Sequence, residues 1–172
     1  TMGPILRYRE WRGALKERTI TREDVFSGFE LFVVGLCFKV LLADQLAPLW
    51  ASLERIGYEY LSTPLAWLGA VSYSLQLYFD FSGYSLMAMG LGQMLALPVP
   101  RNFDLPYTAR SVSEFYRRWH ITLGTWFRDY VYIPLGGSRN GNARTVLSLT
   151  VVWFFTGLWH GASWQFVAWG LW

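Results

Sequence analysis

The chain has 172 residues, of which 53% are hydrophobic, 19% aromatic and 16% charged, with a formal net charge of +3. This balance excludes a disordered chain, and the single cysteine excludes a scaffold held by intrachain disulfides. Charged residues are absent from Thr145 to Trp172, and Asp80 is the only one between Tyr60 and Pro100. Because runs of about 18 or more apolar residues are typical of membrane spans, we expect an all-α integral membrane protein.

The first elements in chain order are a charged segment and a long apolar one. Residues 7–24 are densely charged, which predicts a surface loop or a helix at the membrane interface. Residues 28–50 are apolar except for Glu30, Lys39 and Asp44, and they are long enough as a helix to cross a core of about 30 Å. Because charge is costly in lipid, Lys39 and Asp44 should lie near an end of this helix or face protein or water.

The next apolar stretch, Pro64 to Pro100, would extend roughly 55 Å as one helix, which exceeds an untilted crossing. We therefore predict two membrane elements joined between Asp80 and Gly83. A lone carboxylate in apolar surroundings needs a partner, and we expect an arginine from residues 101–144 to pair with Asp80. Direct contact with substrate is the alternative role for Asp80.

Residues 101–144 form a basic, aromatic connection with seven arginines and three acidic residues, which favours the cytoplasmic face. Ser111 and Glu114 have capping-box spacing, which predicts the start of an amphipathic helix. Such a helix would carry three side chains on one side: Phe115, Trp119 and Thr122. The glycine-rich residues 136–141 lack the Lys-Ser/Thr ending of a phosphate loop and predict a turn.

The arginines of this connection admit two interpretations. Arg117, Arg118 and Arg128 could bind phosphate groups of a substrate, or they could set the topology beside anionic lipid. Nucleic-acid binding is not expected, because the basic residues lie between apolar runs and no nucleic-acid-binding module is recognisable.

The chain contains two histidines, and both are candidates for chemistry. His160 lies in the uncharged run 145–172, so it must find a partner or line a watery cavity, and a neutral imidazole suits proton abstraction from a hydroxyl. A packing histidine bonded to a carbonyl is the alternative. His120 is either a second acid–base or binding group or an interfacial polar residue. We expect no metal site, because neither histidine spacing nor a carboxylate cluster supports one.

Four motifs in fixed order carry a resemblance that extends over essentially the whole chain. They are Tyr78–Ser85 (YFDFSGYS), Ser113–Tyr130 (SEFYRRWHITLGTWFRDY), Ile133–Gly137 (IPLGG) and Gly157–Ala162 (GLWHGA). Together they resemble the membrane-bound O-acyltransferase family, in its bacterial branch that acetylates polysaccharides. On this resemblance we expect residues 1–172 to be part of one such domain, with both ends truncated.

The resemblance implies a multi-pass protein of the cell inner membrane, with helices around a central tunnel and an acyltransferase activity. The acyl donor would come from the cytoplasm, and we expect it to be acetyl-CoA. Acetyl-CoA would act as a substrate, and we expect no bound cofactor. His160 matches the family's catalytic histidine, and His120 matches its second, tunnel-lining position. We expect further side chains to contact substrate: Asp80, Arg117, Arg118, Trp119, Trp126, Arg128 and Trp159.

The expected reaction is acetyl transfer toward an exported polysaccharide such as alginate, directly or through a periplasmic relay protein. Two alternatives stay open. One is D-alanyl transfer to teichoic acid by a related branch, although the Ile133–Gly137 motif and the Gly-Ala after His160 fit the acetyltransferases better. The other is a non-catalytic transporter or export scaffold, in which Lys39, Asp80 and His160 form a proton or substrate pathway.

Overall fold

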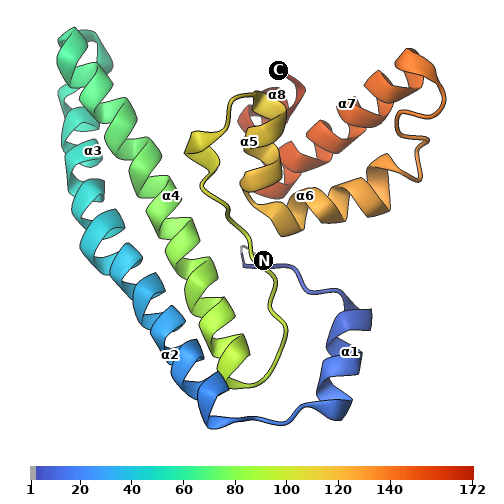
Figure 1. The fold of residues 1–172 in the computed structure, drawn as a ribbon. Helices are drawn as coiled ribbons and strands as arrows, with labels where there is room; N and C mark the ends of the chain where they lie inside the picture. Colours follow the sequence, from blue (N-terminus) through green and yellow to red (C-terminus); the bar gives the residue numbers. More distant parts are fainter. Residues whose placement is uncertain (1–2) are drawn as a thin grey trace. The chain divides into compact units, whose positions relative to one another are not determined.

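The computed structural model describes residues 3–172. Across these residues the chain is helical, joined by turns and extended connections (Figure 1). It divides into two compact units, one ending at Thr122 and the other beginning at Leu123. The all-α class expected from the sequence is therefore confirmed.

The charged N-terminal segment forms an amphipathic helix, α1 (Tyr8–Glu17). Tyr8, Trp11 and Leu15 follow one side of α1 and are all exposed. Arginines and a lysine flank this stripe, at positions 9, 12 and 16. Of the two alternatives for residues 7–24, the structure thus has a helix with an apolar stripe, the pattern of helices that lie in a membrane interface.

A single helical rod follows, built from α2 (Arg22–Cys37), η1 (Phe38–Ala43) and α3 (Asp44–Ile56). Thr21 starts it with a complete capping box, in which its hydroxyl accepts from Asp24 N at 3.1 Å and its own N donates to the Asp24 carboxylate at 2.9 Å. Gly57 ends it at φ 90°, a conformation that glycine adopts without strain. Among the helices of residues 3–172, only this rod meets the criteria of length and apolar composition for a membrane span.

The middle of the rod, η1, is π-helical, and this geometry places an ion pair. Asp44 N donates to Lys39 O, five residues back, and the Lys39 ammonium lies 2.7 Å from Asp44 Oδ1. In an α-helix, residues five apart point about 140° away from each other. The wider π-turn brings them over one another, so the local backbone explains how these two charges meet.

Residues 63–94 form one uninterrupted helix, α4 (Thr63–Met94), and the predicted break between Asp80 and Gly83 is wrong. One glycine costs a helix only about 1 kcal/mol, which the packing on α2 outweighs here. At about 1.5 Å per residue the helix reaches roughly 48 Å, which is longer than a hydrocarbon core of about 30 Å and comparable to a whole bilayer with its headgroup layers.

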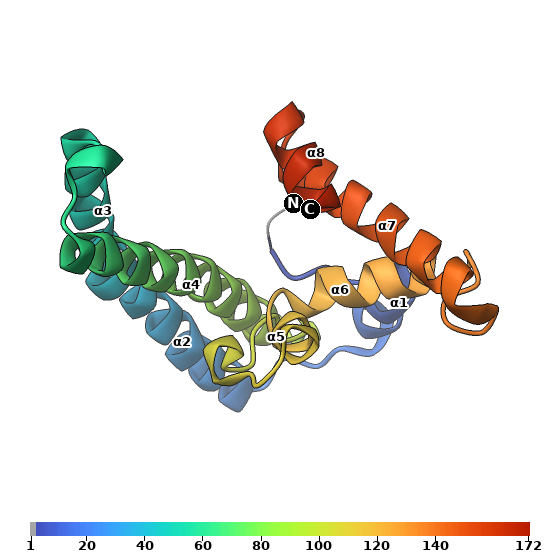
Figure 2. The same cartoon turned by 90° about the horizontal axis from the view of Figure 1, so that it is seen from above.

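Two glycine pairs bring α2 and α4 into close contact, with the helices antiparallel (Figures 1 and 2). A Cβ on Gly35 would lie 2.6 Å from Gly83 O, and one on Gly90 would lie 2.5 Å from Gly28 O. All four glycines are buried. Backbones that approach this closely are typical of helix pairs in membranes, where small residues form the interface.

The remaining elements are shorter. They are η2 (Tyr58–Tyr60), η3 (Pro106–Thr108), α5 (Val112–Arg118), α6 (Ile121–Phe127), η4 (Arg128–Tyr132), α7 (Gly141–His160) and α8 (Trp164–Leu171). Turns occupy the residues between η4 and α7, as predicted from their glycines. In the second unit α8 turns back against α7, which Figure 2 shows clearly.

The charge-poor helices α4 and α7 do not meet the criteria of length and apolar composition that the α2–α3 rod meets. Absence of charge is not the same as apolarity: α4 carries several serines, and Ser82 and Ser74 donate to backbone carbonyls four residues back at 2.6 and 2.7 Å. Such bonds satisfy the serine hydroxyls inside the helix. The serines nevertheless lower the mean hydropathy of α4. The number of membrane crossings therefore stays a prediction.

Gly35→Ala should destabilise the α2–α4 pair, because its Cβ would clash with the backbone of α4 at Gly83 and Met87. Overpacking of this kind costs about 1–3 kcal/mol. Gly13→Ala is the matched control, since nothing lies within 4 Å of a Cβ there and the change favours the helix. Thermal unfolding of the detergent-purified protein measures both, and equal melting temperatures would contradict the glycine contact.

Candidate functional site

His120 lies at a corner between two short helices. α5 ends at Arg118, and Trp119 is extended and forms an isolated antiparallel bridge with Phe103. His120 follows at φ 47°, a left-handed conformation that few non-glycine residues adopt. Ile121 then begins α6.

The start of α5 is as predicted, but its continuation is not. Ser111 Oγ accepts from Glu114 N at 3.1 Å, whereas the Glu114 carboxylate turns to Arg110 N at 2.8 Å, so only half of the capping box forms. The expected single helix through residue 122 is interrupted at residues 119 and 120, because the backbone on either side of them forms hydrogen bonds with residues 102–104. Asp104 N donates to Arg118 O at 2.9 Å and Ile121 N to Asn102 O at 2.9 Å.

Asn102 is the centre of the polar network at this corner. Its side chain is fully buried, and its Oδ1 lies 3.1 Å from His120 Nδ1, 3.2 Å from Thr122 N and 2.9 Å from Thr122 Oγ1. Its Nδ2 reaches Ser85 Oγ of α4 at 3.4 Å. With its own carbonyl on Ile121 N, Asn102 satisfies the first amides of α6, which have no partner inside the helix.

Aromatic rings cover the apolar side of this corner. Phe81 of α4 meets the His120 ring edge-on, with centroids 4.7 Å apart and an interplanar angle of 89°. Trp119 lies against Phe103 at 5.0 Å and Phe115 at 5.5 Å. The predicted grouping of aromatic side chains beside His120 is thus present within this unit, although Trp119 joins it from an extended backbone.

Asp80 does not pair with an arginine of residues 101–144, as the sequence led us to expect. Its Oδ1 lies 2.8 Å from the ammonium of Lys39, which also holds Asp44. The reason is that Asp80 follows the face of α4 that packs on α2, the same face as Gly83. Lys39 therefore satisfies both carboxylates, and the expectation that Lys39 and Asp44 face protein is met by this cluster.

The three predicted arginines have different surroundings. Arg118 lies 2.6 Å from Glu114 Oε1 and 3.2 Å from Thr108 Oγ1, so it braces α5. Arg128 pairs with its neighbour Asp129 at 2.8 Å and remains largely exposed, and Arg117 is exposed too. Arg117 and Arg128 are the better placed of the three to meet an anionic group.

In the second unit, His160 ends α7 and contacts α8. Its ring lies 5.1 Å from Trp169 at an angle of 82° and is stacked on Phe166 at 6.4 Å. The next residue, Gly161, leaves room for this arrangement, since a Cβ there would lie 2.5 Å from the Phe166 ring. Trp159 is exposed beside it, whereas Trp126 on α6 contacts Phe127 and Tyr130 at 5.3 and 5.4 Å.

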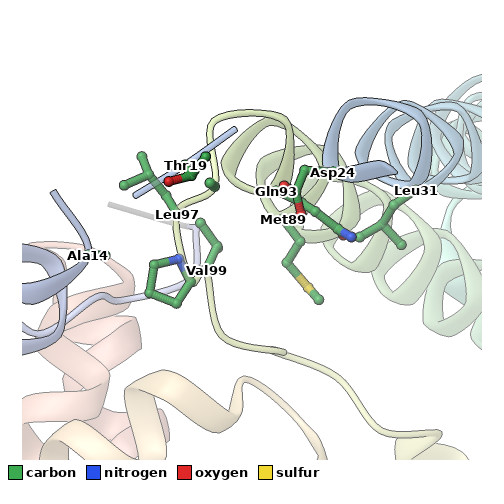
Figure 3. A pocket seen from close by; sticks show the side chains of 10 residues that line it. Ala14, Thr19, Asp24, Leu31, Met89, Gln93, Leu97 and Val99 are labelled. Atoms are coloured by element: carbon green, nitrogen blue, oxygen red, sulfur yellow. The ribbon is translucent and has the colours of Figure 1, made fainter. Parts of the chain in front are cut away.

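A pocket of about 550 Å³ lies between α1, α2, α4 and the segment that follows α4 (Figure 3). Two of its polar side chains already have partners: Asp24 accepts from Thr21, and Gln93 donates to Ser27 at 2.8 Å. The described residues that line it include none of the predicted site residues. Within residues 3–172 no three His, Cys, Asp or Glu side chains gather as a metal site would require.

Of the predicted site residues, Trp119 and His120 lie together against Phe81 of α4. Asp80 lies on the face of α4 that packs on α2, where it pairs with Lys39. His160 and Trp159 lie at the end of α7. The sequence did not indicate Asn102. Its partners follow 18 and 20 residues later in the chain, so no local spacing reveals them. A polar residue set between Pro100 and Phe103 was the only signal.

An all-helical chain with a long apolar rod, small-residue helix contacts and a histidine at the end of a charge-poor helix fits the class of helical membrane proteins. The profile of the membrane-bound O-acyltransferase family matches residues 1–172, the whole chain, and the chain belongs to that family. The resemblance carried by the four sequence motifs is therefore confirmed.

Relatives agree with this assignment. The chain is 46% identical over 170 residues to "Probable alginate O-acetylase AlgI" of Azotobacter vinelandii, covering 99% of this chain and 34% of that protein. It is 39% identical over 175 residues to the peptidoglycan O-acetyltransferase of Helicobacter pylori, covering 98% and 32%. It is 30% identical over 188 residues to the teichoic acid D-alanyltransferase of Streptococcus thermophilus, covering 99% and 44%. The chain spans about one third of the length of the first two.

Asp80→Asn should lower the stability of the full-length protein and leave any Michaelis constant unchanged, because the carboxylate pairs with Lys39. The control is Asp104→Asn, which removes an isolated pair with Arg101 at 2.9 Å, whereas Asp80 shares the Lys39 ammonium with Asp44. Loss of the isolated pair should cost about 1 kcal/mol or less. Thermal unfolding and substrate titration measure the two effects. A raised Michaelis constant at wild-type stability would instead assign Asp80 to substrate.

Glu114→Gln should destabilise α5 at neutral pH and not in acid. The amide of Arg110 and the guanidinium of Arg118 hold the pKa of Glu114 below its usual value of 4.5. A carboxylate with a lowered folded pKa stabilises the fold above its unfolded pKa, and this contribution disappears as the pH falls through the folded pKa. Hydrogen exchange of residues 112–118 at pH 7 and at pH 2 tests this, with Glu10→Gln as control. Equal exchange in wild type and variant at pH 7 would contradict it.

Proposed function

We propose that the protein containing this chain is a multi-pass acyltransferase of the cell inner membrane, which transfers acetyl groups toward an exported polysaccharide. The observation that carries this proposal is the family match over the whole chain, together with 46% identity to a protein named an alginate O-acetylase. Alginate is the acceptor we favour, and the peptidoglycan O-acetyltransferase relative supports O-acetylation of a glycan more broadly. The helices of the whole protein would surround a central tunnel.

His160 is the proposed general base. Its neutral imidazole takes the proton of an acceptor hydroxyl while the hydroxyl oxygen attacks the acetyl carbonyl. The new C–O bond forms and the C–S bond of the acetyl thioester donor breaks. The departing thiolate takes up the proton that His160 removed from the hydroxyl. A histidine suits this step because its unperturbed pKa lies near the operating pH.

The surroundings of His160 support this role. Phe166 and Trp169 of α8 both contact its ring, and Gly157 allows α8 to pack closely by meeting Gly170. His160 itself is exposed, so its imidazole is accessible to an acceptor hydroxyl.

Acetyl-CoA is the proposed donor, as a substrate that approaches from the cytoplasm. Its phosphates suit exposed guanidinium groups, which Arg117 and Arg128 provide. Trp119, Trp126 and Trp159 would shape the tunnel around the acyl chain. The acceptor is the polysaccharide itself or a periplasmic relay protein that carries the acetyl group to it.

Transfer of D-alanine to teichoic acid is the second candidate, supported by the 30% identical D-alanyltransferase relative. Full-length protein in membranes, incubated with acetyl-CoA and alginate, separates the candidates. Release of free CoA with acetyl ester on the product supports our proposal, and D-alanyl ester in the presence of a charged carrier protein supports the second. Movement of substrate without acyl transfer would indicate a transporter and overturn both.

His160→Ala should lower acetyl transfer by roughly 10²- to 10⁴-fold, the usual contribution of general acid–base catalysis. Gln165→Ala is the control, because this nearby residue is exposed and lies on a different helix, α8. Rates are compared at equal amounts of correctly inserted protein. A His160→Ala variant that transfers acetyl at the wild-type rate would remove His160 from the mechanism.

A further inference from the structure

The apolar stripe of α1 is not covered by the described part of the chain. Tyr8, Trp11 and Leu15 keep 76%, 42% and 43% of their surface exposed. The residue of α1 that faces protein is Ala14, which is half-buried and lines the pocket beside α2 and α4. Ala14 lies about 100° around the helix from Leu15, so α1 contacts the protein with one face and leaves its apolar stripe open.

The charges of α1 are sorted around this stripe. At about 100° per residue, Arg12 and Lys16 lie about 40° and 80° from Tyr8 around the helix, whereas Glu10 lies about 160° away. All three charged side chains are exposed. Within residues 3–172 no ion pair holds Arg12 or Lys16. A surface that meets the stripe therefore also meets two available cations, with the acidic group turned away.

α1 lies at one end of the α2–α4 pair. The guanidinium of Arg18, just after α1, donates to Leu95 O at the end of α4 at 3.3 Å, and Thr21 caps the start of α2. Because the two helices are antiparallel, the start of α2 and the end of α4 share one end of the pair. The end of a membrane-crossing rod lies in the headgroup layer, which is the depth that Trp and Tyr side chains favour.

Charge assigns this end of the pair to the cytoplasmic side. Residues 7–24 carry six basic and four acidic residues, and Arg101 opens the basic connection that follows α4. An excess of arginine and lysine in short segments beside a membrane span favours the cytoplasmic face. The cytoplasmic leaflet is also the one whose anionic lipids attract basic segments.

We propose that α1 lies flat in the cytoplasmic headgroup layer and binds anionic phospholipid. Tyr8, Trp11 and Leu15 insert between the lipids, and Arg12 and Lys16 meet the phosphate groups. This inference does not depend on which group the protein transfers. The competing occupant of the stripe is another segment of the same protein, outside residues 1–172.

The experiment is hydrogen exchange of residues 8–17 in the full-length protein, reconstituted either in phosphatidylcholine vesicles or in an equal mixture of phosphatidylcholine and phosphatidylglycerol. Exchange should be slower in the anionic vesicles. One cation near an anionic surface contributes about fivefold to binding, so Arg12→Gln should speed exchange by about that factor in the anionic vesicles and not in the neutral ones. Arg55→Gln is the matched control, because it removes the same charge at the other end of the rod and should leave residues 8–17 unchanged.

Two further measurements separate insertion from charge. Trp11→Ala should speed exchange in both kinds of vesicle, although alanine favours a helix and would slow exchange in one that is uncovered. Salt at 1 M shortens the Debye length to about 3 Å and should remove the difference between the two kinds of vesicle for the wild type.

Equal exchange of residues 8–17 in the two kinds of vesicle overturns the proposal, and so does an Arg12→Gln variant that exchanges like the wild type in anionic vesicles. Slow exchange that persists in detergent, whatever the lipid, would assign the stripe to another segment of the protein. A protein that shows the lipid dependence and transfers no acetyl group would contradict the proposed function and leave this inference standing.

Discussion

Two glycine contacts set the spacing of α2 and α4, and they leave the opposite face of α4 to form the polar corner around His120. Gly83 and Gly90 lie seven residues apart on one face of α4 and meet the backbone of α2. Phe81 and Ser85, two residues to either side of Gly83, point to the opposite face. One face of α4 therefore fixes the helix in place, and the other supplies a ring to His120 and a hydroxyl to Asn102.

Local patterns predicted the helices and failed at their junctions. The apolar stretch at 28–50, the N-terminal cap of α5 at Ser111 and the glycine-rich turn all depend on residues a few positions apart, which can be predicted from the sequence. The continuity of α4 depends instead on what lies beside it. A glycine read in isolation suggests a break, whereas Gly83 beside Gly35 is what allows the two backbones to touch.

The candidate site divides in the same way. His120, Trp119 and His160 stand out because polar or aromatic residues beside them form recognisable motifs. Asn102 has no such motif, and its importance comes from contacts with residues far from it in the chain. The partner of Asp80 was missed for the same reason, because Lys39 comes from a different helix and meets it only once α2 and α4 pack.

The π-turn of η1 also affects how the rod can change in length. A π-turn holds one residue more than the α-turn it replaces, and it keeps the helix on either side in phase. Loss of one residue within η1 would leave Leu53 of α3 against Gly69 of α4, although Lys39 and Asp44 would separate. The same loss elsewhere in the rod would turn every later side chain by about 100°. The extra residue thus confines the effect of a deletion to one ion pair and spares the packing of a whole helix.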